Sequence, residues 1–440
     1  MHDRLKHGQH SNKSALEQFL GEPLRVHCRN LPLATISTSV LDIRSAGWKA
    51  LEGDLLYPLL LLKENAVASN ISLMVKYCQE ANVLHAPHAK TPMSPQLVWR
   101  LLEAGAWGTS IASVDQARVM RRFGVSRLLM ANQLIEEQGL RWIAQEIQRD
   151  PEFDFWCLVD SVHGVELMDA ALAGTPSAVK IKVLIEVGVM NGRAGCRNES
   201  EIIAVAQAIK RTSNLELSGI ELYEAMAAKG ATTEQKLIAV DTALAALRHS
   251  MCILVERGLI RTSAEVIVTA GGSLYFDRVV EAMRLPLADI RDVKVVLRGG
   301  CFLTHEAGEN DCLSPLSGRS SMPCTLHQGL ELWGLVLSRP EPGLAILNFG
   351  KRDAPFDKGL PVSFAEKRRG CPVEKVGEKL QILSLNDQHA RVSIPPDHEL
   401  SPGDLVGFHI SHPCTAFDKW QLVPVVDESY AVIDGIVTFF

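Results

Sequence analysis

Between about residues 64 and 300, short apolar runs alternate with longer segments in which apolar residues recur every three or four positions. The first pattern is typical of buried strands and the second of amphipathic helices. Over 232–257, for example, Leu237, Val240 and Leu244 follow the spacing of one helical face. Eight strands are predicted in this region, at 83–88, 107–112, 127–132, 155–160, 180–188, 217–223, 266–272 and 293–300.

Strands and helices that alternate in this way form repeated βα units around a parallel sheet. Eight units in succession predict an α/β protein with a (β/α)8 barrel, which we place within residues 50–325. After about residue 330, short strand patterns follow one another without helices, which predicts a C-terminal β domain over 326–440. Residues 1–49 form an N-terminal extension, in which the alternation over 38–43 is a candidate strand of the same β domain.

The composition is that of a folded globular protein, with 47% hydrophobic residues, 22% charged residues and a net charge of -6. This acidic balance disfavours a nucleic-acid partner, because neutralising phosphates requires a basic surface. The longest apolar run, 55–62, is far shorter than the roughly 20 residues that span a bilayer. The N-terminal residues lack the apolar segment of a secretory signal, and the ten cysteines lack the spacing of a disulfide framework. We therefore expect a cytoplasmic protein without membrane partners.

Glycine pairs follow the last two predicted barrel strands. Gly271 and Gly272 precede Ser273, and Gly299 precedes Gly300. In such barrels the active site lies at the carboxyl ends of the strands, and phosphate commonly binds the loops after strands seven and eight. Glycine lets backbone N–H groups approach an anion without interference from Cβ. A tight turn explains either pair alone, but two pairs at the two expected loops favour a phosphate-bearing ligand.

A lysine, Lys90, follows the first predicted barrel strand in the segment PHAKT and is therefore expected at the same end of the barrel. Desolvation there would make its amine the nucleophile that Schiff-base chemistry requires. A lysine whose stem packs while its ammonium reaches water is an equal alternative. A lysine and a phosphate site at one end of a barrel together suggest pyridoxal phosphate as the cofactor.

The C-terminal segment SHPCT contains a candidate metal pair, His412 and Cys414. On a strand, residues two apart point to the same face, and an imidazole with a thiolate suits zinc. Coincidence is the alternative, because the chain has 14 histidines and ten cysteines.

Together these motifs resemble the fold-type III pyridoxal-phosphate enzymes, and within them the D-serine dehydratase and D-threonine aldolase group. PHAKT resembles the motif whose lysine carries the cofactor, which implies this role for Lys90. EVGVMNGRAGCR implies that Arg193 faces the pyridine nitrogen, and ELYEA implies that Tyr223 contacts the cofactor. HPC resembles the zinc pair of the dehydratases, which supports His412 and Cys414. The two glycine loops imply phosphate contacts at Gly271, Gly272, Ser273, Gly300 and Cys301.

The resemblance implies an alanine racemase-like barrel and a lyase that converts a D-3-hydroxy amino acid, such as D-serine, to a 2-oxo acid and ammonia. The main alternative is the aldolase reaction, which releases glycine and an aldehyde. Aldolases of the group resemble His-x-Asp at the metal pair, so Cys414 favours zinc and dehydration, with another divalent metal left open. A racemase, a non-catalytic pyridoxal-phosphate carrier and a dimer scaffold fit less well. We expect a small D-amino acid substrate and a homodimer.

Overall fold

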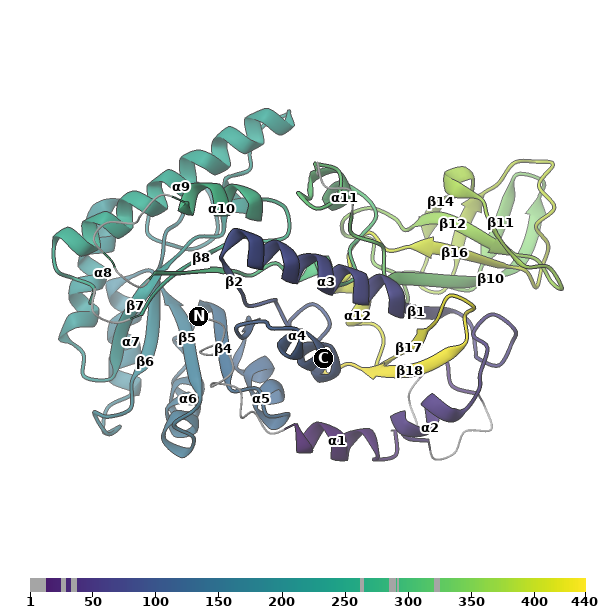
Figure 1. Ribbon diagram of the computed structural model, residues 1–440. Coiled ribbons are helices and arrows are strands. Elements are labelled where there is room, and N and C mark those ends of the chain that lie inside the picture. The colour runs from purple at the N-terminus through teal and green to yellow at the C-terminus, as the bar shows by residue number, and fades with distance from the viewer. Residues whose placement is uncertain are drawn as a thin grey trace.

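A parallel barrel and a C-terminal sheet form two lobes, and helix α3 runs between them (Figure 1). The computed structural model describes residues 13–24, 29–32, 38–261, 265–284, 290, 293–319 and 325–440. The helices are α1 Ser14–Leu20, α2 Val40–Ser45, α3 Glu64–Ala81, α4 Pro95–Glu103, α5 Val114–Arg122, α6 Glu137–Arg149, α7 Val162–Ala171, α8 Glu199–Arg211, α9 Thr233–Glu256, α10 Phe276–Met283, α11 Glu309–Leu313 and α12 Cys414–Phe417, with the 3-10 turns η2 Glu224–Ala227, η3 Cys301–Leu303 and η4 Gly377–Lys379.

The barrel consists of eight parallel strands in the order β2-β9-β8-β7-β6-β5-β4-β3, which confirms the predicted fold class. Each strand lies within one of the eight predicted runs or overlaps it. Backbone hydrogen bonds from Ala89 to Ser110 (2.7 Å) and from Ser110 to Pro87 (3.0 Å) join the two edges of the sheet. The barrel strands are β2 Leu84–His85, β3 Thr109–Ile111, β4 Arg127–Gln133, β5 Asp154–Val159, β6 Ile181–Glu186, β7 Leu215–Glu221, β8 Val266–Ala270 and β9 Val293–Leu297.

The helices around the barrel begin where polar residues cap them. Ser113, Ser161 and Asn198 each accept a hydrogen bond from the backbone N–H three residues later, at the starts of α5, α7 and α8. Thr232 and Gln235 form a capping box at the start of α9. In the described part of the chain, α9 is the one helix long and apolar enough to cross a membrane, and here it packs against α8, α10 and β7.

The barrel interior contains two layers that follow the strand repeat. The apolar layer is formed by Ala86, Leu129, Ala131, Trp156, Leu158, Leu184, Ile267 and Val296. Residues two positions further along a strand point to the same side. The residues at those positions, or beside them in strand register, form what we call the polar layer. This layer consists of His88, Gln133, Asp160, Glu186, Glu221, Thr269 and Arg298. The polar layer therefore lies at the carboxyl ends of the strands.

The second lobe is a ten-stranded sheet whose main path runs β13-β12-β16-β10-β1-β17-β18. Strand β1 comes from the N-terminal side of the barrel and pairs antiparallel with β10 and parallel with β17. The predicted barrel segment, 50–325, thus includes one strand of the C-terminal sheet. The strands of this sheet are β1 Leu59–Lys63, β10 Leu330–Glu341, β11 Leu344–Leu347, β12 Val362–Lys367, β13 Val373–Lys375, β14 Gln381–Leu385, β15 Ala390–Ser393, β16 Leu405–His409, β17 Leu422–Val426 and β18 Val432–Val437.

The strand predicted over 38–43 was wrong, because this segment contains helix α2. Ser39 and Asp42 form a capping box, with hydrogen bonds of 2.8 and 3.2 Å, that starts the helix. The helix packs against β18, where Ile43 lies next to Gly435. In its described residues the extension therefore covers the β domain with this helix and adds no strand to the sheet.

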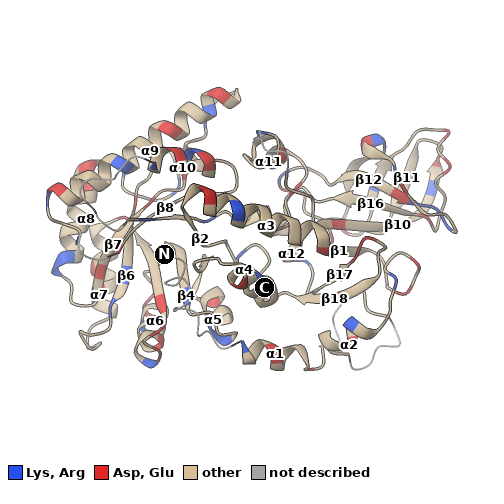
Figure 2. Cartoon of the chain, viewed as in Figure 1, with Lys and Arg blue, Asp and Glu red and all other residues tan. Residues whose placement is uncertain are grey.

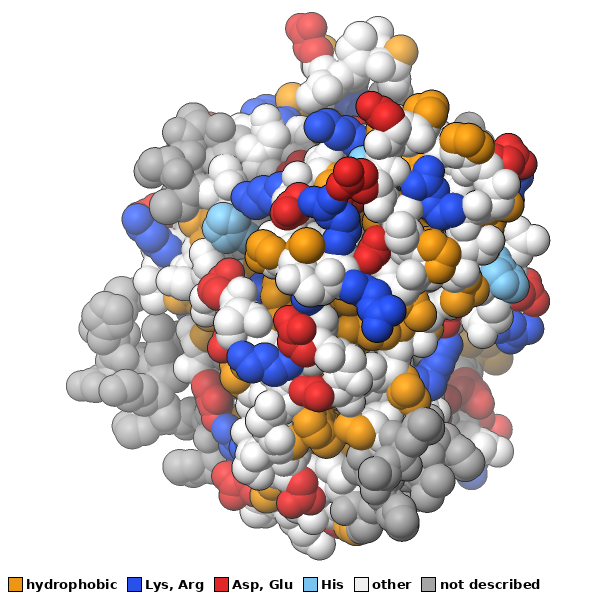
Figure 3. Space-filling model, turned by 90° about the vertical axis from the view of Figure 1, so that its right-hand side faces the viewer, with side chains coloured by type: hydrophobic (Ala, Val, Ile, Leu, Met, Phe, Trp, Pro, Cys, Tyr) orange, Lys and Arg blue, Asp and Glu red, His pale blue; other side chains and the backbone are white. Residues whose placement is uncertain are grey.

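Charged residues lie mainly on the outer helices and loops of both lobes (Figure 2). On the face shown in Figure 3, acidic and basic side chains are interspersed. This mixture agrees with the small net charge of -6.

Candidate active site

The polar layer contains a buried ion pair with unsatisfied atoms. Arg298 donates to Glu221 and to the carbonyl oxygen of Leu222. Two further atoms of this pair, Glu221 Oε2 and Arg298 Nε, are buried without a hydrogen bond to any described residue, and so is Nδ1 of His88. Buried polar groups are rarely left unpaired in folded proteins. Their position at the mouth of the barrel therefore indicates a site for a polar ligand.

Burial shifts the pKa values of ionisable side chains in the polar layer. Burial raises the pKa of Glu221 to about 7, although the charge of Arg298 lowers it. Burial also lowers the pKa of His88, and the positive charges of Lys90 and Arg298 lower it further. His88 is therefore a neutral imidazole close to two cationic side chains.

The structure places Lys90 in the turn after β2, at the predicted end of the barrel, with an exposed side chain. The next residue, Thr91, is only 3% exposed, and its hydroxyl is 3.1 Å from Sγ of Cys414. The turn that carries the predicted lysine thus lies against the predicted metal pair, although the two are more than three hundred residues apart.

Arg193 and Tyr223 lie together on neighbouring strand ends. Arg193 lies in the loop after β6, and its guanidinium is 5.3 Å from the centre of the Tyr223 ring. Tyr223 follows β7 and is partly buried, and this burial raises its pKa. The positive charge of Arg193 also lowers the pKa of His88, as expected if the guanidinium faces the mouth of the barrel.

Some backbone N–H groups of the glycine loops already donate hydrogen bonds to the protein itself. Glu224, which is fully buried, accepts hydrogen bonds from the N–H groups of Gly271 (2.9 Å) and Gly272 (2.7 Å). Burial raises the pKa of Glu224, while these N–H groups lower it. Of the predicted phosphate donors, Gly271 and Gly272 are thus already bonded to a carboxyl group.

Other N–H groups of the same loops remain available. In the described residues, the N–H groups of Ser273, Gly300 and Cys301 make no hydrogen bond to the protein. Gly300 also lies close to the turn before Lys90, since a Cβ at this position would be 2.9 Å from the carbonyl oxygen of His88. The two loops and the Lys90 turn therefore surround a common space that side chains larger than glycine would reduce.

His412 and Cys414 do come together, but the strand argument for them was wrong. Strand β16 ends at His409, and Cys414 begins the short helix α12. Nδ1 of His412 is 2.6 Å from Oδ2 of Asp357, and Thr415 donates to the other oxygen of this carboxylate at 2.7 Å. A carboxylate at one ring nitrogen orients the other nitrogen toward a metal.

The sulfur of Cys414 has three polar neighbours: Thr91, His412 and Cys301. The hydrogen bond from the Cys301 thiol, with those from His412 and Thr91, lowers the pKa of Cys414 to about 4 against the effect of burial. The same contact raises the pKa of Cys301. Burial lowers the pKa of His412, but Cys414 and Asp357 raise it more strongly. Cys414 is therefore poised as a thiolate, the form that binds metals.

Comparison with known proteins identifies both lobes. Residues 62–270 match the alanine racemase N-terminal domain, and residues 329–426 match the putative serine dehydratase domain. The chain belongs to the fold-type III pyridoxal-phosphate enzymes. Within this family it falls in the D-serine dehydratase and D-threonine aldolase group and is a pyridoxal-phosphate-dependent lyase. The resemblance inferred from the motifs is confirmed.

Individual relatives of this family are distant. A D-threonine aldolase from Arthrobacter sp is 23% identical over 342 residues, which cover 77% of this chain and 80% of the relative. The crystal structure of D-threonine aldolase from Filomicrobium marinum has a TM-score of 0.71 at 19% identity, covering 88% of this chain and 95% of that one. The D-threo-3-hydroxyaspartate dehydratase from Delftia sp. HT23 has a TM-score of 0.69 at 16% identity, covering 88% and 98%. These structures share the fold.

The site fits the cofactor of this family. Lys90 lies on an exposed turn, the polar layer offers unpartnered atoms, and Ser273, Gly300 and Cys301 offer free N–H groups for a phosphate. For a metal, His412 and Cys414 provide a nitrogen and a thiolate. No group of three or more potential metal-ligating side chains is present among the described residues. A metal at this pair would therefore take further ligands from water or substrate.

Several residues of the site were not predicted. The polar layer had a usable signal, because each of its members except Glu221 stands two residues after an apolar residue in the sequence. No sequence signal identified Glu224, Thr91 or Asp357, because their roles depend on contacts with residues that are distant in sequence.

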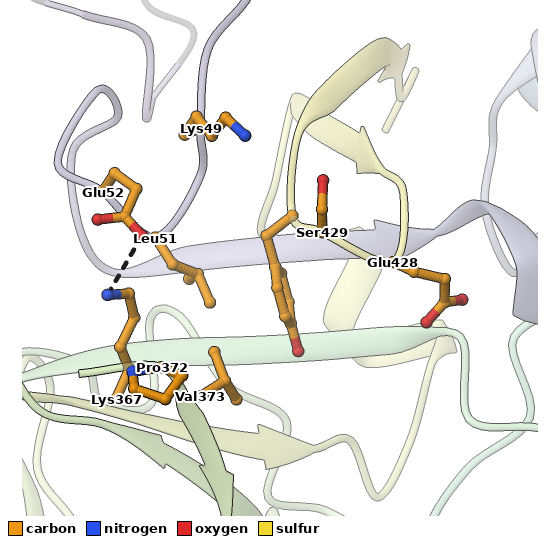
Figure 4. A pocket seen from close by; sticks show the side chains of 9 residues that line it. Lys49, Leu51, Glu52, Lys367, Pro372, Val373, Glu428 and Ser429 are labelled. Atoms are coloured by element: carbon orange, nitrogen blue, oxygen red, sulfur yellow. Dashed lines mark ion pairs between the residues drawn. The ribbon is translucent and has the colours of Figure 1, made fainter.

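A second cavity, of about 270 Å³, lies in the C-terminal lobe (Figure 4). Its charged lining residues are Lys49, Glu52, Lys367 and Glu428, and Lys367 pairs with Glu52 at 3.2 Å. None of the predicted site residues lines it. Its charges balance, so it does not select a charged ligand of either sign.

Proposed function

We propose that this lyase dehydrates and deaminates a D-3-hydroxy amino acid of the D-serine type to a 2-oxo acid and ammonia, with zinc at His412 and Cys414. The observation that supports this most directly is the contact of 3.1 Å between Thr91, beside Lys90, and Cys414. This contact supports the proposal because the residue next to Lys90 touches one member of the proposed metal pair. A metal held there would lie close to the β-substituent of a substrate whose α-amino group is near Lys90.

The chain's own residues have separable tasks. Bound pyridoxal phosphate supplies a sink for the electron pair at Cα of the substrate. Lys90 binds the cofactor and offers Nζ as the base for the Cα proton. The N–H groups of Ser273, Gly300 and Cys301 would hold the phosphate, and Tyr223 would contact the cofactor beside them. Arg193 would face the pyridine nitrogen and keep it from holding a proton, because a second positive charge there is unfavourable.

The metal pair acts on the β-hydroxyl. A zinc ion at His412 and Cys414 would supply Lewis-acid stabilisation to the departing hydroxide. Asp357 holds the His412 ring, and the Thr91 hydroxyl contacts the Cys414 sulfur, so both ligands would be oriented before a metal binds. A milder electron sink at the pyridine makes this help at the leaving group more important.

Aldolase cleavage is the second candidate, because the Arthrobacter relative and the Filomicrobium structure bear that name. The two reactions differ in which bond breaks, either Cβ–O or Cα–Cβ. The softer thiolate of Cys414 favours zinc and dehydration over the harder ions that carboxylates prefer. We also propose that the enzyme is a cytoplasmic homodimer, whose mass light scattering would measure and whose location cell fractionation would determine.

Product analysis tests the function. The purified enzyme, loaded with cofactor and zinc, is incubated with D-serine, D-threonine and D-3-hydroxyaspartate, and keto acid, ammonia, glycine and aldehyde are measured. We expect a keto acid and ammonia in equal amounts from at least one of the three. L-Serine and the Lys90→Ala variant serve as controls that give no product. Glycine and an aldehyde as the products would assign the aldolase reaction instead.

Metal removal tests the role of the metal pair. A chelator should abolish elimination from D-serine but leave elimination from β-chloro-D-alanine largely intact, because chloride needs little Lewis-acid help. Cofactor absorption should persist, and zinc should restore the reaction with D-serine. Equal loss with both substrates would mean that the metal is structural and does not act on the leaving group.

A further inference from the structure

Two cysteines from different lobes lie side by side at the edge of this site. Cys301 begins η3, in the second glycine loop of the barrel, and Cys414 begins α12 in the β domain. Their Sγ atoms are 3.9 Å apart, and both side chains are half-buried. The proposed metal pair leaves the Cys301 thiol without a role, because Cys301 lies in the second glycine loop and not in the HPC segment.

We propose that Cys301 and Cys414 form a reversible disulfide that takes Cys414 away from the metal. The cross-link depends on the geometry alone, whereas its effect on catalysis rests on the function proposed above. The chain would thereby carry an oxidation site that stops metal-assisted elimination and leaves Lys90 untouched.

The geometry allows the bond. Sulfurs in a disulfide are about 2.05 Å apart, so the two atoms must approach by about 2 Å. A change between staggered rotamers moves a cysteine sulfur by roughly 3 Å, which is enough without moving the backbone far. Each cysteine is the first residue of a short helical segment, where the side chain is not enclosed by a preceding turn. In the described residues, the other cysteines show no such sulfur contact.

The reaction requires a two-electron oxidant, for which we name a peroxide. The Cys414 sulfur attacks one peroxide oxygen, an S–O bond forms, the O–O bond breaks and hydroxide leaves. The sulfur of Cys301 then attacks the resulting sulfenic acid, the S–S bond forms and the S–O bond breaks. The leaving oxygen and the hydroxide take up the protons that are released, and two waters result. A dithiol reductant returns both cysteines to thiols by exchange.

The contacts identify the resolving cysteine. The Cys414 sulfur lies 3.1 Å from the Thr91 hydroxyl and 3.9 Å from the Cys301 sulfur, so Cys301 is the thiol in place to resolve a sulfenic acid formed at Cys414. A metal at His412 and Cys414 would occupy the same sulfur lone pairs. Bound zinc should therefore slow the oxidation, and the oxidised chain should not bind zinc at this pair.

Peptide mapping tests the proposal with the full-length chain, loaded with pyridoxal phosphate and stripped of metal. After treatment with one equivalent of hydrogen peroxide and alkylation of free thiols, the protein is digested without reduction and analysed by mass spectrometry. We expect a linked pair of peptides that contain Cys301 and Cys414, absent after dithiothreitol. Zinc uptake at this pair, measured by elemental analysis after desalting, should fall at least tenfold on oxidation and return on reduction.

Variants make the result specific. Cys312→Ser and Cys371→Ser remove other cysteines of this half of the chain and should keep the cross-link. Cys301→Ser should lose it and accumulate a sulfenic acid at Cys414 that dimedone traps, and Cys301→Ala provides the same test if the serine variant does not fold. Linkage of Cys414 to another cysteine, or oxidation of Cys414 without linkage in the wild type, would overturn the proposal.

The outcomes separate this proposal from the function. A chain that forms the disulfide but gives no keto acid from any D-3-hydroxy amino acid refutes the function and retains the cross-link. A chain that eliminates water from D-serine but never forms the disulfide retains the function and refutes the cross-link.

Discussion

The apolar and the polar layer of the barrel are built by the same strands, one strand repeat apart, yet they serve different ends. Leu184 and Glu186 stand two residues apart on β6, and both are almost fully buried. Leu184 fills the barrel, whereas Glu186 accepts a hydrogen bond from Gln133. Burial stabilises the fold in the first layer and costs stability in the second, because polar atoms lose water there. Polar side chains that are buried at a cost to stability therefore indicate where the candidate active site lies.

The largest effect is expected just beyond the polar layer, at Lys90. Lys90→Ala should abolish both the visible absorption of the bound cofactor and the turnover of every substrate, because only a lysine imine gives this chromophore. Absorption spectra before and after borohydride, followed by peptide mapping, check this. Lys76→Ala, on the exposed side of α3, is the matched control and should behave as wild type. A pyridoxyl group mapped to another lysine would contradict the assignment.

Within the apolar layer we expect a large effect on stability. Leu184→Ala should lower the free energy of unfolding by about 2–5 kcal/mol, because it removes a buried side chain and leaves a cavity. Urea unfolding monitored by fluorescence measures the change. Glu186→Gln, in the polar layer, should leave stability at neutral pH unchanged or higher while lowering turnover, because burial disfavours the charge that the substitution removes. The distinction between the layers fails if both variants lose stability to the same degree.

A smaller effect is expected at the glycine loops. Gly300→Ala should weaken retention of the cofactor about ten- to a hundredfold, since its Cβ would lie 2.9 Å from the carbonyl oxygen of His88 and overpacking costs about 1–3 kcal/mol. Equilibrium dialysis against pyridoxal phosphate measures this loss. Gly343→Ala is the matched control, because its Cβ would have only one neighbour, at 3.8 Å. Equal affinity in both variants would place the phosphate elsewhere.

The smallest effect is a dependence of stability on pH. The pKa of Glu221 is raised from 4.5 to about 7, so between these values the folded chain keeps a proton that the unfolded chain has released. Rising pH therefore favours unfolding in this window, by up to about 1.4 kcal/mol per pH unit. Urea unfolding at pH 5, 6 and 7 should show this slope in wild type but not in Glu221→Gln. Parallel slopes would mean that Glu221 is ionised throughout.

Much of the barrel could be predicted because its strands and helices carry strong periodic signals. The C-terminal sheet was harder. Strand β12 contains Glu366 and Lys367, which are buried and pair with His398 and Glu52, and β13 has just three residues. The alternation of apolar and polar residues over 38–43 predicted a strand, although Ser39 and Asp42 in the same segment form a capping box. A capping box is itself a sequence signal for a helix.

The site could be predicted where its residues are adjacent in sequence. The segments around Lys90 and the glycine pairs each lie at a strand end, so the barrel rule alone brings them together. His412 and Cys414 are neighbours, as expected, but a turn and a helix start bring them together and not a strand, and their role as a metal pair stays a prediction. The contacts of Glu224 with the first glycine loop, and of Asp357 with His412, depend on how distant segments pack, which spacing does not encode.

The position of β1 has a consequence for how the protein is made. This strand consists of Leu59–Lys63, all buried, between β10 and β17, whose residues lie about 270 and 360 positions later. A ribosome therefore releases these leucines long before their partners exist, and the barrel has time to fold first. Until the last strands emerge, four apolar side chains and two open strand edges must be kept from pairing with other chains. Residues 326–440 expressed alone would lack the middle of their own sheet.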